Sequence, residues 1–175
     1  AHGFSLKEIS SVFITHAHTD HCGNVAPLLK ENPEIKVYIH PAGKMRLIDP
    51  ASASAGLKGK LLPRMIARFG VMEPVPESRI EYLKDGEVFD LGNGVRLRTI
   101  FAPGHQPSGI VILEEKSGGL FINDLVGLQL ADVGMSLVLT PYRMDVVQSM
   151  EALQKFLKMP VRRLFLGHYG ISENS

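Results

Sequence analysis

Short apolar runs alternate with polar segments along the chain, and their lengths predict a mixed α/β fold. Residues 11–15 are β-branched and aromatic, which is typical of a buried strand. A helix is expected from about residue 24 to residue 30, and residues 36–39 have the pattern of a second strand. A strand, a helix and a strand in this order predict a βαβ unit with two parallel strands.

The second half of the chain predicts an antiparallel run followed by a helix. Five more strands are expected where short apolar runs end in turn residues; they cover residues 79–83, 87–91, 95–101, 109–113 and 120–123. From residue 145 to residue 158, apolar residues recur at helical spacing between a start signal at Thr140-Pro141 and a stop at Pro160. Residues 163–166 predict a last short strand.

The stretch from about residue 41 to residue 76 is the least regular part of the sequence. It is rich in Ala, Ser, Gly and Pro and contains a basic amphipathic piece from Leu57 to Phe69. A stretch of this length is too short to bury a core of its own, so we expect a single domain over residues 1–175 with a lid-like insertion at about 41–76. Two roles stay open for four apolar residues, which either line a flexible substrate pocket or pack the insertion: Met45, Met65, Phe69 and Met72.

Composition and charge narrow the class of protein. Of 175 residues, 45% are hydrophobic and 21% are charged, which is close to the average for a globular domain. Lys and Arg number 19 against 18 Asp and Glu, so the basic excess of a dedicated nucleic-acid binder is missing. The one cysteine, Cys22, excludes an internal disulfide.

The first residues and the lengths of the apolar runs predict the cellular location of the protein. No apolar run approaches the roughly 18 residues of a membrane span, and the first four residues lack the basic start and apolar stretch of a signal peptide. We therefore expect a cytoplasmic protein with neither nucleic acid nor a membrane as partner. A homodimer is left open.

The residues directly after the first predicted strand carry the chemistry. His16-Ala17-His18-Thr19-Asp20-His21 places four potential metal ligands within six residues. In an extended chain His16 and His18 point to the same side, and Asp20 and His21 can face a second point as the chain turns into a helix. Two metal ions a few ångströms apart could share these ligands. The alternative, a polar loop with surface histidines, explains such a dense set poorly.

Four motifs resemble those of the metallo-β-lactamase superfamily and stand in that family's order. Residues 15–23 match its H-x-H-x-D-H signature, and Ala102-Pro103-Gly104-His105 resembles its P-G-H motif. Phe121-Ile122-Asn123-Asp124 is similar to the strand that ends in its bridging aspartate, and Leu166-Gly167-His168 to its last G-H motif. The resemblance implies an α/β fold of the αββα sandwich type, whose N-terminal strands would lie outside this sequence.

The resemblance also implies a role for each matching residue. The first metal would be bound by His16, His18 and His105, the second by Asp20, His21 and His168, and both by the bridging Asp124. Asp20 would in addition be catalytic, because it would orient the attacking hydroxide and later protonate the leaving group. Imidazole and carboxylate ligands imply two divalent ions, with Zn²⁺ as the first choice and iron or manganese as alternatives.

The implied function is a dinuclear metal-dependent hydrolase. A metal-bridged hydroxide would attack an ester, thioester or lactone carbonyl of a small-molecule substrate, as in the glyoxalase II-like and lactonase-like branches that the motifs resemble. Two alternatives stay open, a persulfide dioxygenase-like enzyme with one iron and a non-catalytic fragment. For Cys22 a small buried apolar role is preferred to a soft ligand or redox-sensitive thiol, and for His40 a place at a strand end is preferred to metal ligation.

Overall fold

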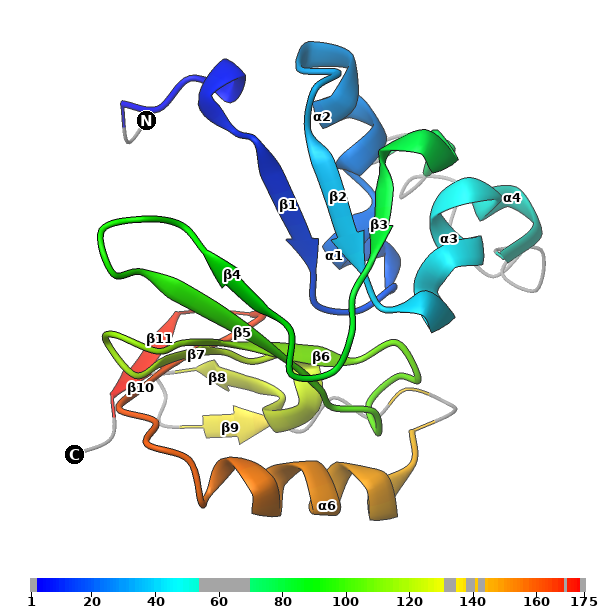
Figure 1. The fold of residues 1–175 in the computed structure, drawn as a ribbon. Helices are drawn as coiled ribbons and strands as arrows, with labels where there is room; N and C mark the ends of the chain where they lie inside the picture. The colour runs from blue at the N-terminus through cyan, green and yellow to red at the C-terminus, as the bar shows by residue number, and fades with distance from the viewer. Residues whose placement is uncertain are drawn as a thin grey trace. The chain divides into compact units, whose positions relative to one another are not determined.

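The computed structural model describes residues 3–53, 70–130, 135–137, 141, 144–168 and 170–173. The chain divides into two compact units, which we call unit 1 (Ala1–Tyr82) and unit 2 (Leu83–Ser175). Figure 1 shows the elements of each unit. None of the helices within the described ranges has both the length and the apolar character needed to cross a bilayer.

Unit 1 is built on a three-stranded parallel sheet in the order β1-β2-β3. The strands are β1 (Ser11–Ile14), β2 (Lys36–Ile39) and β3 (Ile80–Tyr82). The crossover from β1 to β2 contains α1 (Thr19–Cys22) and α2 (Val25–Glu31). The predicted βαβ unit with its parallel pair is therefore confirmed.

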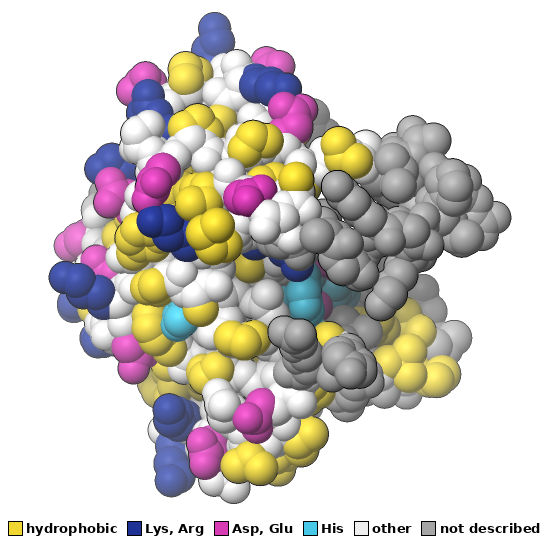
Figure 2. All heavy atoms as spheres, turned by 90° about the vertical axis from the view of Figure 1, so that its right-hand side faces the viewer, with side chains coloured by type: hydrophobic (Ala, Val, Ile, Leu, Met, Phe, Trp, Pro, Cys, Tyr) yellow, Lys and Arg dark blue, Asp and Glu magenta, His cyan; other side chains and the backbone are white. Residues whose placement is uncertain are grey.

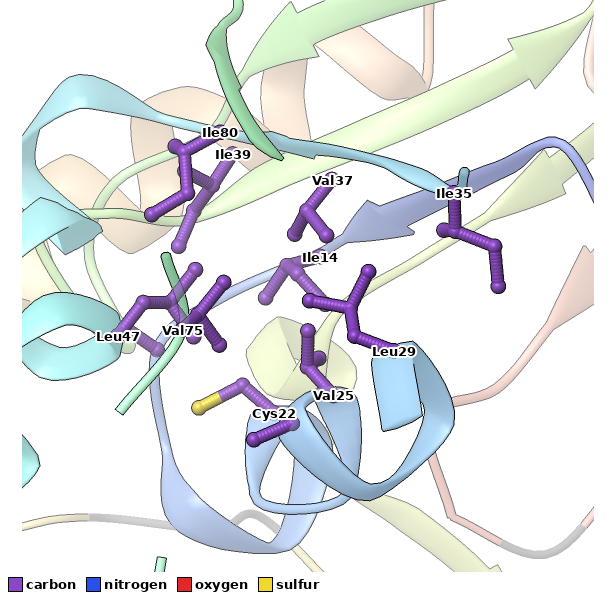
Figure 3. Packing of buried hydrophobic residues seen from close by; sticks show 12 residues of the cluster. Ile14, Cys22, Val25, Leu29, Ile35, Val37, Ile39, Leu47, Val75 and Ile80 are labelled. Carbon is purple, nitrogen blue, oxygen red and sulfur yellow. The ribbon is translucent and has the colours of Figure 1, made fainter. Parts of the chain in front are cut away.

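The core of unit 1 forms where α2 packs on this sheet. Every second residue of a strand points to the same face, so Val37 and Ile39 of β2 both point into the core, where each is fully buried. Val25 and Leu29 lie one helical turn apart on α2 and meet them from the helix side (Figure 3). Each such side chain contributes roughly 1.5–3 kcal/mol when it is fully buried. This packing fixes the position of the segment that joins β1 to α2.

The beginning of the expected insertion is helical. Residues 41–53 form η2 (Pro41–Gly43), α3 (Lys44–Ile48) and α4 (Pro50–Ala53). Leu47 of α3 is fully buried, and its carbonyl accepts a hydrogen bond from the Val75 N–H at 2.9 Å. Met72 packs on the same core, whereas Met45 is exposed. The basic piece from Leu57 to Phe69, which includes Met65, lies outside the described residues, and the lid role stays a prediction.

Unit 2 contains a six-stranded mixed sheet in the order β11-β10-β7-β6-β5-β4. In chain order its strands are β4 (Val88–Asp90), β5 (Arg96–Phe101), β6 (Ile110–Glu114), β7 (Gly119–Phe121), β10 (Arg163–Phe165) and β11 (Ile171–Glu173). Only the pair of β7 and β10 is parallel. The helix α6 (Val146–Phe156) packs on this sheet through Ala152 and Phe156.

Smaller elements complete the two units. A 3-10 helix η1 (Leu6–Glu8) precedes β1, and η4 (Glu77–Arg79) precedes β3. In unit 2, η5 (Asp124–Val126) follows β7, and β8 (Leu128–Leu130) pairs with β9 (Met135–Leu137). The predicted mixed α/β class is confirmed, while α3, β8, β9 and β11 were not expected from the sequence.

Candidate metal centre

In unit 1 the predicted ligands follow β1 directly. His16 is fully buried, and its Nε2 lies 3.0 Å from Nδ1 of His18. The ring of His16 also lies 4.2 Å from the ring of His21, measured between centroids. Two imidazole nitrogens at 3.0 Å need a shared proton or a cation between them, because their lone pairs repel one another. The distance therefore fits either an N–H···N hydrogen bond or two nitrogens that bind one metal ion.

Asp20 and His21 are consecutive residues of the short helix α1. The Oδ2 atom of Asp20 lies 3.4 Å from Nε2 of His21. The side chain of Asp20 is 62% exposed, whereas that of His21 is only 11% exposed. An exposed carboxylate beside a mostly buried imidazole can exchange protons with water while the imidazole stays fixed.

In unit 2 the predicted ligands lie at one edge of the sheet. Strands β5 and β7 are both antiparallel to β6, and β10 is parallel to β7, so β5, β7 and β10 run in the same direction. Their carboxyl ends therefore meet at one edge, where each strand is followed by a loop with one predicted ligand. These ligands are His105, Asp124 and His168.

Two of these side chains, both imidazoles, converge on one carboxylate oxygen of the third. Oδ2 of Asp124 lies 3.7 Å from Nε2 of His105 and 3.3 Å from Nε2 of His168. The side chains of Asp124 and His105 are each 4% exposed and that of His168 is 28% exposed. An ionised carboxylate buried this deeply needs positive charge close by, either from protonated imidazole or from a metal ion.

A glycine allows the loop of His105 to lie against α6. Gly104 has a φ of +134°, and a Cβ atom there would come within 2.3 Å of Ser149 Oγ and 2.6 Å of the Ser149 backbone nitrogen. The carbonyl of Gly104 accepts a hydrogen bond from the Asp145 N–H at the start of α6, at 2.8 Å. The helix thus supports the loop directly beside His105.

Substitution of Gly104 by alanine is expected to move the His105 loop and to lower stability by about 1–3 kcal/mol, because it adds both strain and a clash. Thermal unfolding and the metal affinity of the purified variant measure the two effects. Gly86→Ala is a matched control, since Gly86 also has a positive φ, +75°, but has open space around its Cβ position. If both variants bind metal like the parent protein, the contact with Ser149 does not position His105.

Two further residues, Cys22 and His40, were weighed as possible metal ligands from the sequence, and both have structural roles. Cys22 is fully buried in the same hydrophobic cluster as Val25 and Leu29 (Figure 3). Its Sγ donates a hydrogen bond to the His18 carbonyl at 3.1 Å. Burial raises the pKa of its thiol to about 11. Nδ1 of His40 accepts a hydrogen bond from the Ala42 N–H at 3.0 Å and so caps η2. These placements agree with the preferred interpretation of both residues.

Each unit therefore gathers its own predicted ligands. Unit 1 brings together His16, His18, Asp20 and His21, and unit 2 brings together His105, Asp124 and His168. Sequence reasoning did not single out Asn123, whose only signal is its place directly before Asp124. Nitrogen and carboxylate oxygen donors of this kind fit zinc, iron and manganese.

Known proteins share this fold. A family model described as the metallo-beta-lactamase superfamily matches residues 1–168. The metallo-beta-lactamase fold-containing protein ST1585 of Sulfurisphaera tokodaii is 27% identical over 173 residues, which are 95% of this chain and 62% of that protein. The crystal structure of ST1585 matches with a TM-score of 0.82 at 25% sequence identity, over 97% of this chain and 66% of that one.

Two further similarities are more distant. An atrochrysone carboxyl ACP thioesterase of Aspergillus fumigatus is 25% identical over 166 residues, which are 95% of this chain and 40% of that protein. TTHA1623, solved in a di-iron-bound form, has a TM-score of 0.66 at 24% identity over 93% of this chain and 71% of that one. This chain spans less than two thirds of the length of ST1585 and of the thioesterase. The resemblance seen in the motifs is confirmed, and the chain belongs to the metallo-β-lactamase superfamily.

Proposed function

We propose that this protein is a dinuclear metal-dependent hydrolase that cleaves an ester, thioester or lactone bond. The observation that carries the proposal is the buried carboxylate of Asp124 between the imidazoles of His105 and His168. Proteins of this superfamily bind divalent metals and are generally hydrolytic. A carboxylate held between two imidazoles is suited to bridge two cations, because its negative charge offsets their mutual repulsion.

The family motifs assign the remaining ligands. In this proposal the first metal is held by His16, His18 and His105, the second by Asp20, His21 and His168, and Asp124 serves both. Zinc is the first choice for these donors, with iron or manganese as alternatives. When bound, the metal pair supplies a water of lowered pKa and a Lewis acid for the carbonyl oxygen.

The residues of the chain then perform distinct tasks. The buried rings of His16 and His105 hold their nitrogens in fixed directions, since packing leaves them no room to rotate. Asp20 orients the attacking water, holds its proton on a carboxylate oxygen and delivers that proton to the leaving group. Its exposure to solvent allows it to return to the starting protonation state after each turnover.

A thioester is the most specific substrate class for which there is support. Two relatives are named thioesterases. One is the Aspergillus fumigatus protein described above, at 25% identity. The other is the thioesterase pkgB of Emericella nidulans, which is 28% identical over 118 residues, 67% of this chain and 24% of that protein. On the face shown in Figure 2, lysine and arginine side chains are interspersed with aspartate and glutamate, which differs from the clustered basic patch typical of a nucleic-acid interface. A cytoplasmic location, the absence of a membrane partner and a homodimer stay predictions.

Metal analysis combined with a substrate panel tests this function. We expect purified protein to carry two zinc ions per chain and to hydrolyse an acyl thioester or a lactone, but not a phosphodiester. A chelator should stop turnover, and added Zn²⁺ or Mn²⁺ should restore it. One iron per chain without hydrolysis would instead support the persulfide dioxygenase alternative, and a chain that binds no metal and turns over nothing would support the non-catalytic one.

A further inference from the structure

Asn123 lies directly before the candidate bridging aspartate and is fully buried. It connects the end of β7 to η5, the short helix that begins with Asp124. Its Oδ1 accepts a hydrogen bond from the Leu125 N–H at 2.8 Å, which caps η5. One end of the Asn123 amide thus fixes the backbone on both sides of Asp124.

The other end of the same amide contacts the loop that carries His105. Nδ2 of Asn123 donates a hydrogen bond to the Ile110 carbonyl at 3.1 Å and lies 3.5 Å from the Ala102 carbonyl. Ala102 and Ile110 are the two ends of this loop, which is closed at its base by the bond from the Ala102 N–H to the Gly109 carbonyl at 2.8 Å. The amide therefore holds both ends of the loop at once.

The chemistry of this position requires an amide. A side chain that accepts from one N–H and donates to two carbonyls needs an acceptor oxygen and an NH₂ group on the same carbon, which only Asn and Gln provide. The reversed orientation would turn the oxygen toward two carbonyl oxygens, so the bonding pattern fixes the amide. Gly109 leaves space for it, because a Cβ there would lie 3.0 Å from Nδ2 and 2.3 Å from the Ala102 carbonyl oxygen.

We propose that Asn123 is a positioning residue whose buried amide fixes the loop of His105 relative to Asp124, so that both side chains keep a geometry able to hold a metal ion. The inference rests on the proposed metal centre and adds a residue to it. Removing a hydrogen-bonding residue behind metal ligands typically lowers metal affinity about 10- to 100-fold. We expect a loss of that size when the NH₂ group of Asn123 is removed.

Two substitutions separate the two ends of the amide. Asn123→Ser keeps an oxygen that can accept the Leu125 N–H but has no group that reaches the loop, whereas Asn123→Ala removes both functions. Zinc affinity, measured by competition with a chromophoric chelator, is expected to fall about 10- to 100-fold in both variants. The absorption bands of bound Co²⁺ should also shift, because they report the arrangement of the ligands.

A readout without metal tests the positioning directly. In metal-free Asn123→Ser, hydrogen exchange of peptides covering residues 102–110 should become faster, since the loop loses its buried donor. Thr99→Ala is the matched control. Thr99 is equally buried in unit 2 and donates through Oγ1 to the carbonyls of Lys84 at 2.9 Å and Glu87 at 3.3 Å, and both acceptors lie outside the loops of His105 and Asp124.

Each outcome decides between the explanations. If Asn123→Ser binds zinc as tightly as the parent protein, the cap on η5 is sufficient and the proposal is wrong. It is equally overturned if Thr99→Ala weakens zinc binding by the same factor, because general loss of stability then explains the effect. If Asn123→Ala does not fold, the comparison of Asn123→Ser with Thr99→Ala decides alone. A parent protein that binds no zinc would refute the metal centre itself. The hydrogen-exchange measurement uses metal-free protein, so it still tests whether Asn123 holds the loop of His105.

Discussion

Replacing Asp124 by alanine is expected to remove most of the bound metal and to lower hydrolysis about a thousandfold or more. The reason is that the carboxylate is nearly inaccessible to solvent and lies within 3.7 Å of both imidazoles in its unit, whereas alanine has no oxygen that could bind a cation there. A bound metal stabilises the transition state by several kcal/mol, and a loss of about 4 kcal/mol corresponds to roughly a thousandfold in rate. Elemental analysis and the steady-state rate on a thioester measure the two effects.

Two further variants make the Asp124 result interpretable. Asp124→Asn keeps the shape of the side chain and removes its charge, so it should lose metal without a loss of packing. Asp90→Ala removes a carboxylate from an exposed position of the same unit, where Oδ1 accepts a hydrogen bond from the Gly92 N–H at 2.8 Å, and should keep both metal and activity. Unchanged metal content and rate in Asp124→Ala would remove Asp124 from the centre.

Replacing Asp20 by asparagine is expected to lower kcat by about 10²- to 10⁴-fold, the range typical of a lost general acid or base. Asparagine retains the size of the side chain and one oxygen donor, but it cannot carry a proton between the water and the leaving group. The effect on KM should be small, because Asp20 acts on the reacting atoms and not on the remainder of the substrate. Rates measured with zinc in excess separate this effect from weaker metal binding.

Asp49→Asn serves as the control for Asp20→Asn. It removes one carboxylate charge from the same unit and keeps the oxygen that accepts the Ser52 N–H at 3.0 Å. Its rate is expected to stay within about twofold of the parent rate, since surface substitutions away from such sites change little. Asp20 would be only a ligand, and not a catalytic group, if kcat of Asp20→Asn recovered fully at high zinc.

Much of the fold could be predicted because it depends on local pattern. The helix predicted over residues 145–158 is observed at 146–156, and the strand predicted over 36–39 is observed with the same bounds. By contrast, β11 has three residues and exists through its pairing with β10, so no local pattern indicates it. The same reason explains why β8 and β9 were missed.

The candidate site likewise has a part that is set by local sequence and a part that is set by long-range contacts. The residue types and spacing from His16 to His21 are local and predict metal ligation by themselves. The convergence of His105, Asp124 and His168 depends on three strands that run in one direction, which is a property of the sheet. Asn123 could not be predicted at all, since its role consists of hydrogen bonds to backbone atoms 13 and 21 residues away in sequence.

Because Cys22 is fully buried, the native protein is suited to spectroscopic labelling at introduced cysteines. Burial raises the pKa of its thiol to about 11, so far less of it is present as thiolate at neutral pH than in an ordinary surface cysteine of pKa about 8.5. Maleimide or nitroxide reagents would therefore react with cysteines introduced at exposed sites such as Glu31 and Lys158, and leave the native sulfur untouched. Probe pairs could be attached to both halves of the molecule without first deleting a residue beside a candidate ligand.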